Sequence, residues 1–257
     1  MGADDVLVVQ VDDRVATVTL NRPGARNALS AELLAALPDT MAALDEDSEV
    51  DVLVLTGADP AFCAGLDLKD LAAGRIDLGR LERPFGPLAK PVIGAVNGVA
   101  VTGGLEVALT CDFIVASDRA RFADTHARIG VQPGWGLTAL LPQAIGLRRS
   151  REMSLTGNTI DAPTALAWGL VNRVVPHEEL LATCRALAAD IVSNEQEGAR
   201  RLLRTYAEGA GFDAATARRL EWEAAAEWRR EGRATPEEVE RRRGAVIARG
   251  RQQLDRP

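Results

Sequence analysis

The stretch "KPVIGAVNGVAVTGGLEVALTCDFIVAS", residues 90–117, contains the pattern that decides the fold. A short apolar run leads through a glycine-bearing loop into a helical segment that begins with "GGLEVALT", and the run "FIVAS" follows. Short apolar runs rich in β-branched residues are typical of strands that are buried on both faces of a sheet. The order of strand, helix and strand predicts a right-handed crossover in a mostly parallel sheet.

The preceding sequence repeats this order. The run "VDVLVLTG", residues 50–57, predicts another buried strand, and residues 58–74 predict a loop leading into a helix. Residues 6–20 indicate two strands around a tight turn, and Ser30 is placed to cap a helix over residues 31–47. The fold class is therefore α/β, and both glycine-bearing loops are expected at one edge of the sheet, where such folds bind ligands.

From about Asp161 onward the sequence predicts helices only. The last of them has a strong start signal, because Thr235 is an N-cap candidate, Pro236 occupies the first helical position and Glu238 follows three residues after the cap. No repeat or low-complexity linker separates this tail from the α/β part. We expect the tail to dock on the core or on a neighbouring subunit.

Composition restricts the class of protein. The 257 residues are 47% apolar and 26% charged, as in an ordinary globular protein. The net charge of -7 argues against a general affinity for nucleic acid or for an anionic membrane. The acidic N-terminal stretch does not resemble a secretory signal, and no apolar run approaches the roughly 20 residues that span a bilayer. These features predict a cytoplasmic protein.

Several common chemistries find no support in the sequence. Three cysteines, Cys63, Cys111 and Cys184, lie in apolar stretches and are expected to be reduced, and no Cys/His spacing resembles a zinc site. The segment "GWGLTA" fits a dinucleotide signature but follows a proline rather than a buried strand, and no G-x-S-x-G elbow occurs. The arginines after residue 200 alternate with glutamates, which favours solvated helix faces over an anion-binding or subunit-contact role.

Two loops carry candidate chemistry. In "AFCAGLDL", Gly65 permits a turn that other residues resist, and the Leu66 amide precedes a helix start near Asp67. In "VTGGLEV", the amides of Gly103 and Gly104 enter a helix and have no partner within it. Two such amides from adjacent crossovers can converge on one oxygen. This is the geometry that an oxyanion hole needs, and it suits a thioester carbonyl that becomes an enolate.

Glu106 is the candidate proton carrier. It follows Gly103 by three residues and therefore lies one turn further along the same helix face. Its neighbours within the turn are apolar, so its carboxyl group is expected to be poorly solvated, which suits a group that accepts and returns a proton. The alternative is a structural carboxylate that binds backbone amides.

Four segments together resemble the crotonase family, also called the enoyl-CoA hydratase/isomerase superfamily. They are "LNRPGARNALS", "AFCAGLDLKDL", the opening stretch, and "FADTHARIGVQPGWG". The resemblance implies a spiral core of ββα turns over residues 1–190 and a helical C-terminal region over residues 191–257 involved in trimerisation and pocket closure. It also implies an acyl-CoA thioester substrate, a homotrimer or dimer of trimers, and no cofactor beyond the CoA of the substrate.

The resemblance also implies roles for individual residues. The oxyanion donors correspond to Leu66 and Gly103, and the first catalytic glutamate to Glu106. Backbone around Ala64, Leu66 and Leu68 is implied to meet the adenine end of CoA. Arg26 and Lys69 are candidates for contact with its phosphates, although exposed basic residues are usually only solvated. The full substrate-binding prediction comprises Arg26, Ala64, Gly65, Asp67, Leu68, Lys69, Gly104 and Trp135.

The sequence departs from the family pattern at three positions. His126 occupies the place of the second catalytic glutamate, and Thr102 replaces the first of three glycines. Trp135 replaces a small residue, where its ring either narrows the acyl pocket or packs over the helix.

The identity of His126 leaves several reactions open. A neutral imidazole near pH 7 can position water for hydration, or the histidine merely orders its loop. The leading prediction is hydration of a trans-2-enoyl-CoA. The alternatives are isomerisation, decarboxylation or thioester hydrolysis in the same fold, or a non-catalytic acyl-CoA-binding protein.

Overall fold

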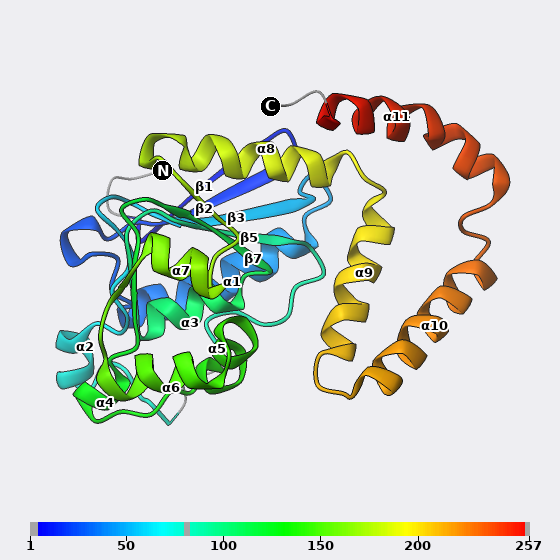
Figure 1. Ribbon diagram of the computed structural model, residues 1–257. Coiled ribbons are helices and arrows are strands. Elements are labelled where there is room, and N and C mark those ends of the chain that lie inside the picture. The colour runs from blue at the N-terminus through cyan, green and yellow to red at the C-terminus, as the bar shows by residue number, and fades with distance from the viewer. Residues whose placement is uncertain (1–4, 80–82, 255–257) are drawn as a thin grey trace. The chain divides into compact units, whose positions relative to one another are not determined.

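The computed structural model describes residues 5–79 and 83–254. The chain divides into two compact units, one ending at Gln196 and the other beginning at Glu197 (Figure 1). None of the helices within the described ranges is long and apolar enough to cross a membrane.

A six-stranded sheet forms the centre of the first unit (Figure 1). The first two strands pair antiparallel, and every later neighbour pairs parallel. The strands lie in the order β1 (Leu7–Asp12), β2 (Val15–Leu20), β3 (Val52–Gly57), β5 (Val92–Val96), β7 (Phe113–Ser117) and β10 (Arg173–Val175). The mostly parallel sheet predicted from the sequence is confirmed.

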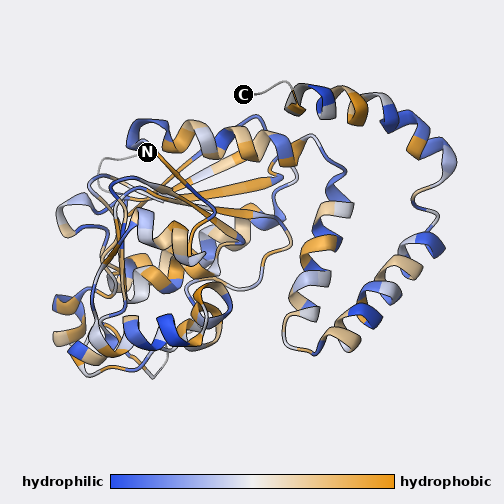
Figure 2. Cartoon of the chain, viewed as in Figure 1, coloured by the Kyte–Doolittle hydropathy of each residue, from blue (hydrophilic) through white to orange (hydrophobic). Residues whose placement is uncertain are grey.

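Both faces of this sheet are covered. Val52 and Val54 of β3 belong to an apolar cluster with α8 (Leu180–Val192), whereas Leu53 and Leu55 belong to the larger cluster that includes α1 (Ala31–Glu46) and α3 (Gly103–Thr110). Successive side chains of a strand point to opposite faces, which explains why such a strand is apolar throughout. The central strands are accordingly hydrophobic along their length (Figure 2).

A second sheet of four short strands produces the spiral. Its order is β4 (Ala61–Cys63), β6 (Val99–Val101), β8 (Arg121–Ala123) and β9 (Ile160–Asp161). Three times the chain passes from a strand of the large sheet to one of the small sheet and then into a helix: α2 (Leu68–Ala72), α3 or α4 (His126–Ile129). This repeated ββα turn confirms the core implied by the family resemblance.

The short strands were not predicted individually. β4, β6 and β8 have three residues each, too few to show an alternating pattern. The prediction of helices alone after Asp161 was wrong, because β9 and β10 lie in this segment. β10 forms by pairing along β7, a tertiary contact that three residues of local sequence do not specify.

Two predicted N-caps are confirmed, at the starts of α1 and of the last helix. Ser30 Oγ accepts a hydrogen bond from the Leu33 amide at 3.2 Å, and Thr235 Oγ1 accepts one from the Glu238 amide at 3.3 Å. α8 packs on the sheet and belongs to the first unit, although the predicted division at 190/191 crosses it. The other helices are η1 (Pro23–Ala25), α5 (Leu137–Ile145), α6 (Leu147–Thr156), α7 (Ala162–Trp168), η2 (His177–Glu179), α9 (Gln196–Gly209), α10 (Ala214–Arg230) and α11 (Pro236–Leu254).

Gly104 permits a close approach between two turns of the spiral. A Cβ atom at this position would lie 2.1 Å from the carbonyl oxygen of Cys63, which belongs to the backbone of β4. Since backbone cannot rotate away as a side chain can, any larger residue must push α3 from the small sheet.

We therefore expect Gly104→Ala to lower the free energy of unfolding by at least about 2 kcal/mol, the scale of overpacking in a core. Urea unfolding measures this change. Gly24→Ala is the matched control, because nothing lies within 4 Å of a Cβ at Gly24. Equal stability of the two variants would contradict the proposed close contact.

Candidate active site

The three turns of the spiral place their helix starts around one cavity of about 530 Å³. All four predicted catalytic residues, Leu66, Gly103, Glu106 and His126, line it. Ala64, Leu68 and Trp135 of the predicted substrate-binding set also line it. The sequence prediction that both glycine-bearing loops share one edge is confirmed.

The two candidate oxyanion amides lie on adjacent loops. A Cβ atom added to Gly65 would lie 3.5 Å from the Gly103 nitrogen, so the loops are in close contact. Gly65 has φ +90°, a conformation that L side chains rarely adopt. Among the described residues, no protein acceptor is found for the amides of Leu66 and Gly103. Both residues line the cavity.

Thr102 stabilises the loop before α3. Its φ of +55° is unusual for a residue with a side chain and agrees with the glycine that the family has at this place. The Thr102 hydroxyl lies 2.5 Å from that of Thr125 and accepts a hydrogen bond from the Thr125 amide at 3.1 Å. The threonine therefore joins the start of α3 to the start of α4.

The two carboxylate oxygens of Glu106 have different surroundings. The side chain is buried, with the residue only 2% exposed. Oε1 accepts a hydrogen bond from the backbone amide of Trp135 at 2.9 Å, and Oε2 lies 3.5 Å from Nε2 of His126. The alternative role for Glu106 was a structural carboxylate that binds backbone amides. One such bond, from Trp135, is present, but it involves only one of the two oxygens. The other oxygen faces His126 at the cavity that both residues line.

His126 is held between two carboxylates. Its Nδ1 lies 2.6 Å from Oδ1 of Asp124, and the same oxygen accepts a hydrogen bond from the His126 amide at 3.1 Å. Burial lowers the pKa of His126, but the hydrogen bonds to Asp124 and Glu106 outweigh it and raise the pKa to about 9. At neutral pH the side chain is therefore an imidazolium. The sequence alone predicts a neutral imidazole, from the ordinary pKa of histidine. The structure corrects this expectation, because the two carboxylates raise the pKa of His126.

Asp124 is a site residue that the sequence prediction missed. Burial would raise the pKa of its carboxyl group, but hydrogen bonds from His126 and Ser154 lower it overall, so the group stays charged. Its position two residues before His126 and directly after a strand was the available signal. A carboxylate so placed fixes the orientation of the histidine ring and favours its protonated form.

Trp135 contributes differently through its main chain and its side chain. The amide binds Glu106, whereas the buried ring lines the cavity beside Gly103, where an added Cβ would lie 3.1 Å from the ring atom Cζ3. The ring thus lies against the start of α3 and also borders the cavity.

Other predicted binding residues lie outside the cavity wall. Arg26 and Lys69 are exposed. The Asp67 carboxylate binds Arg22 and caps α2 through the amides of Lys69 and Asp70. The predictions for substrate contacts by Arg26, Asp67 and Lys69 therefore stay predictions, while the structural role of Asp67 is visible.

A core of ββα turns with two available amides beside a buried glutamate places the chain among crotonase-type proteins. A model of the enoyl-CoA hydratase/isomerase family matches residues 10–231, and the chain belongs to this family.

Named relatives agree with this assignment. The chain is 39% identical to a probable peroxisomal enoyl-CoA hydratase 1 of Arabidopsis thaliana over 82% of each chain. It is 36% identical to a short-chain-enoyl-CoA hydratase of Clostridium acetobutylicum, covering 85% of this chain and 87% of that one. A crystal structure of an enoyl-CoA hydratase from Mycobacterium smegmatis has 49% identity and a TM-score of 0.76, covering 89% of this chain and 100% of that one.

The raised pKa of His126 makes stability depend on pH. The folded chain binds this proton more tightly than an unfolded chain with a histidine pKa of 6.5, so the stabilisation is full below pH 6.5 and is lost as the pH rises through about 9. We expect the free energy of unfolding to fall by on the order of 3 kcal/mol across that range, at about 1.4 kcal/mol for each pKa unit. Asp124→Asn removes the main partner and should flatten this dependence, as measured by urea unfolding at several pH values.

His177→Gln is the control for this experiment, since His177 is the second of only two histidines. The free energy of unfolding of this variant should depend on pH as steeply as that of the wild type. A wild-type slope equal to that of Asp124→Asn would refute the assigned coupling.

Proposed function

We propose that this protein hydrates trans-2-enoyl-CoA thioesters, with Glu106 as the base and the His126 imidazolium as the acid. The observation that carries the proposal is the arrangement of Glu106 Oε2 and His126 Nε2, 3.5 Å apart at a cavity that Leu66 and Gly103 also line. The relatives named above as enoyl-CoA hydratases support the reaction class.

The thioester carbonyl would lie between the two amides. Negative charge develops on this oxygen when a nucleophile adds to the conjugated double bond, and the amides stabilise it more in the transition state than in the bound substrate. The acyl chain would then extend along apolar cavity residues such as Leu71, Ile129 and Val131.

The proton steps balance within the pair. Glu106 takes a proton from water while the water oxygen bonds to C3, and the electron pair of the double bond moves into the thioester enolate. His126 then gives its Nε2 proton to C2, and the enolate collapses to the 3-hydroxyacyl thioester. Transfer of the captured proton from Glu106 to His126 restores the initial state. The reaction moves only water and protons, so it requires no redox cofactor.

Assembly as a homotrimer or dimer of trimers is part of the same proposal. The C-terminal unit exposes large apolar side chains, among them Leu202, Tyr206 and Trp222, and contacts between copies of the chain would cover such groups. Closure of the pocket by this region and a cytoplasmic location stay predictions from the sequence.

Incubation of the purified protein with crotonyl-CoA and with a medium-chain trans-2-enoyl-CoA tests the reaction. We expect loss of the conjugated thioester absorbance and a product heavier by one water. Free CoA thiol would indicate hydrolysis, and a product of unchanged mass would indicate isomerisation. Binding of both thioesters with no conversion would support the non-catalytic alternative.

Glu106→Gln should lower the turnover of crotonyl-CoA by about 10²–10⁴-fold, the usual contribution of a positioned acid or base. The amide keeps the shape and can still accept the Trp135 hydrogen bond, so CoA affinity measured by calorimetry should change little. Glu32→Gln on the exposed side of α1 is the control and should retain full turnover. Undiminished turnover by Glu106→Gln would eliminate its assigned role.

His126→Gln should reduce turnover to a similar extent, again about 10²–10⁴-fold, because glutamine cannot supply the proton to C2. His177→Gln should behave as wild type, since His177 bonds to Ser117 and Asp59 and does not line the cavity. Normal hydration by His126→Gln would show that the histidine only orders its loop.

A further inference from the structure

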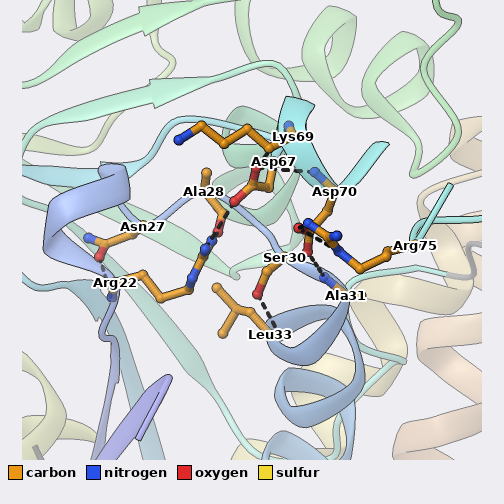
Figure 3. A network of polar contacts seen from close by, with 10 residues as sticks. All are labelled: Arg22, Asn27, Ala28, Ser30, Ala31, Leu33, Asp67, Lys69, Asp70 and Arg75. Atoms are coloured by element: carbon orange, nitrogen blue, oxygen red, sulfur yellow. Dashed lines mark hydrogen bonds and ion pairs between the residues drawn. The ribbon is translucent and has the colours of Figure 1, made fainter. Parts of the chain in front are cut away.

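We infer that Arg22 is a positioning residue for the Leu66 amide and polarises it through two intervening peptide groups; this inference rests on the proposed function. Arg22 lies outside the cavity wall, in the segment between β2 and η1. Its guanidinium lies between the Ala28 carbonyl and the Asp67 carboxylate (Figure 3).

The first step concerns the peptide group that carries the oxyanion donor. The carbonyl of Gly65 and the N–H of Leu66 belong to one peptide group and point in opposite directions, because the peptide bond is planar and trans. The Gly65 carbonyl accepts a hydrogen bond from the Leu29 amide at 2.8 Å. This bond fixes the peptide plane, so the Leu66 N–H must point away from Leu29.

The second step extends the same geometry by one peptide group. The Leu29 N–H shares its peptide group with the Ala28 carbonyl, and that carbonyl accepts a hydrogen bond from Nη1 of Arg22. A continuous chain of donors and acceptors therefore runs from Arg22 through Ala28 and Leu29 to Gly65 and ends at the N–H of Leu66.

The direction of this series of hydrogen bonds determines its effect on the Leu66 N–H. Every hydrogen bond has its donor on the Arg22 side, so the positive guanidinium polarises each peptide group in the same sense. A charged donor also makes a stronger hydrogen bond than a neutral one. The Leu66 N–H at the far end consequently becomes a better donor to the developing oxyanion.

A second contact of Arg22 fixes the backbone after Leu66, at Asp67. Nη2 of Arg22 lies 3.0 Å from Oδ2 of Asp67, and the Asp67 amide donates to the Leu29 carbonyl at 3.0 Å. Burial would raise the pKa of Asp67, but the Arg22 hydrogen bond and the α2 amides lower it overall, which keeps the ion pair charged. The Arg22 side chain is only 24% exposed, so the pair is partly shielded from water. The backbone hydrogen bonds of Gly65 and Asp67 thus fix the position of Leu66 from both sides.

Arg75 provides a matched control close to the same helix. It pairs with Asp70 in the same network (Figure 3), but its side chain is 58% exposed, and its hydrogen bonds go to Asp70 rather than to the 28–29 or 65–66 peptide groups. Neutralising Arg75 removes a comparable ion pair from α2 and leaves the chain to Leu66 intact.

The kinetic test uses the full chain with crotonyl-CoA. We expect Arg22→Gln to lower kcat about tenfold, less than the 10²–10³-fold of deleting an oxyanion donor, with KM unchanged within about threefold. Arg75→Gln should retain wild-type kcat. Arg22→Lys keeps a cation near Ala28 and should recover part of the loss. A well-folded Arg22→Lys no more active than Arg22→Gln would overturn the polarising role.

A spectroscopic readout separates this inference from the hydration proposal. Crotonyl-CoA labelled with ¹³C at the thioester carbonyl is bound to Glu106→Gln, and isotope-edited infrared spectra give its C=O stretching frequency. Adding Arg22→Gln should shift the frequency toward that of free thioester, and adding Arg75→Gln should not. An unchanged frequency would overturn the inference whether or not the wild type hydrates the substrate.

Discussion

Every ββα turn of the core passes from a very short strand into a helix within a few residues. The backbone of each strand pairs within the small sheet. The Leu66 amide before the α2 cap and the Gly103 amide at the start of α3 have no partner among the described residues. Because β4, β6 and β8 lie side by side, the segments that follow them are adjacent as well. The cavity, the two available amides and the pair of Glu106 and His126 all depend on this single constraint.

The electrostatics of the site follow from which side chains the turns place together. Asp124, His126 and Glu106 form a row in which one cation is shared by two carboxylates. A second glutamate in the place of His126 would face Asp124 at short range, and two carboxylates so close resist simultaneous ionisation. His126 and Asp124 carry opposite charges at neutral pH. The histidine that departs from the family pattern is therefore stabilised by the aspartate beside it.

Much of the fold and half of the site were visible in the sequence. The buried strands could be predicted because burial on both faces requires uninterrupted apolar runs, as in β3 and β7. Leu66, Gly103 and Glu106 were found because glycines at helix starts and a glutamate among apolar residues are local features of the chain. Arg22 and the contact of His126 with Glu106 were not found, since they depend on tertiary contacts between segments. The short strands depend on pairing in the same way. Asp124 was missed although its place two residues before His126 is a local signal.

The divided role of residue 135 separates the lining of the cavity from the hydrogen bonding of Glu106. Its main-chain amide orients Glu106, whereas its ring borders the cavity. Every amino acid except proline supplies the same amide, so a substitution at this position keeps the donor that binds Glu106. One position therefore combines a side chain that shapes the cavity wall with a main-chain contact to Glu106 that does not depend on the identity of that side chain.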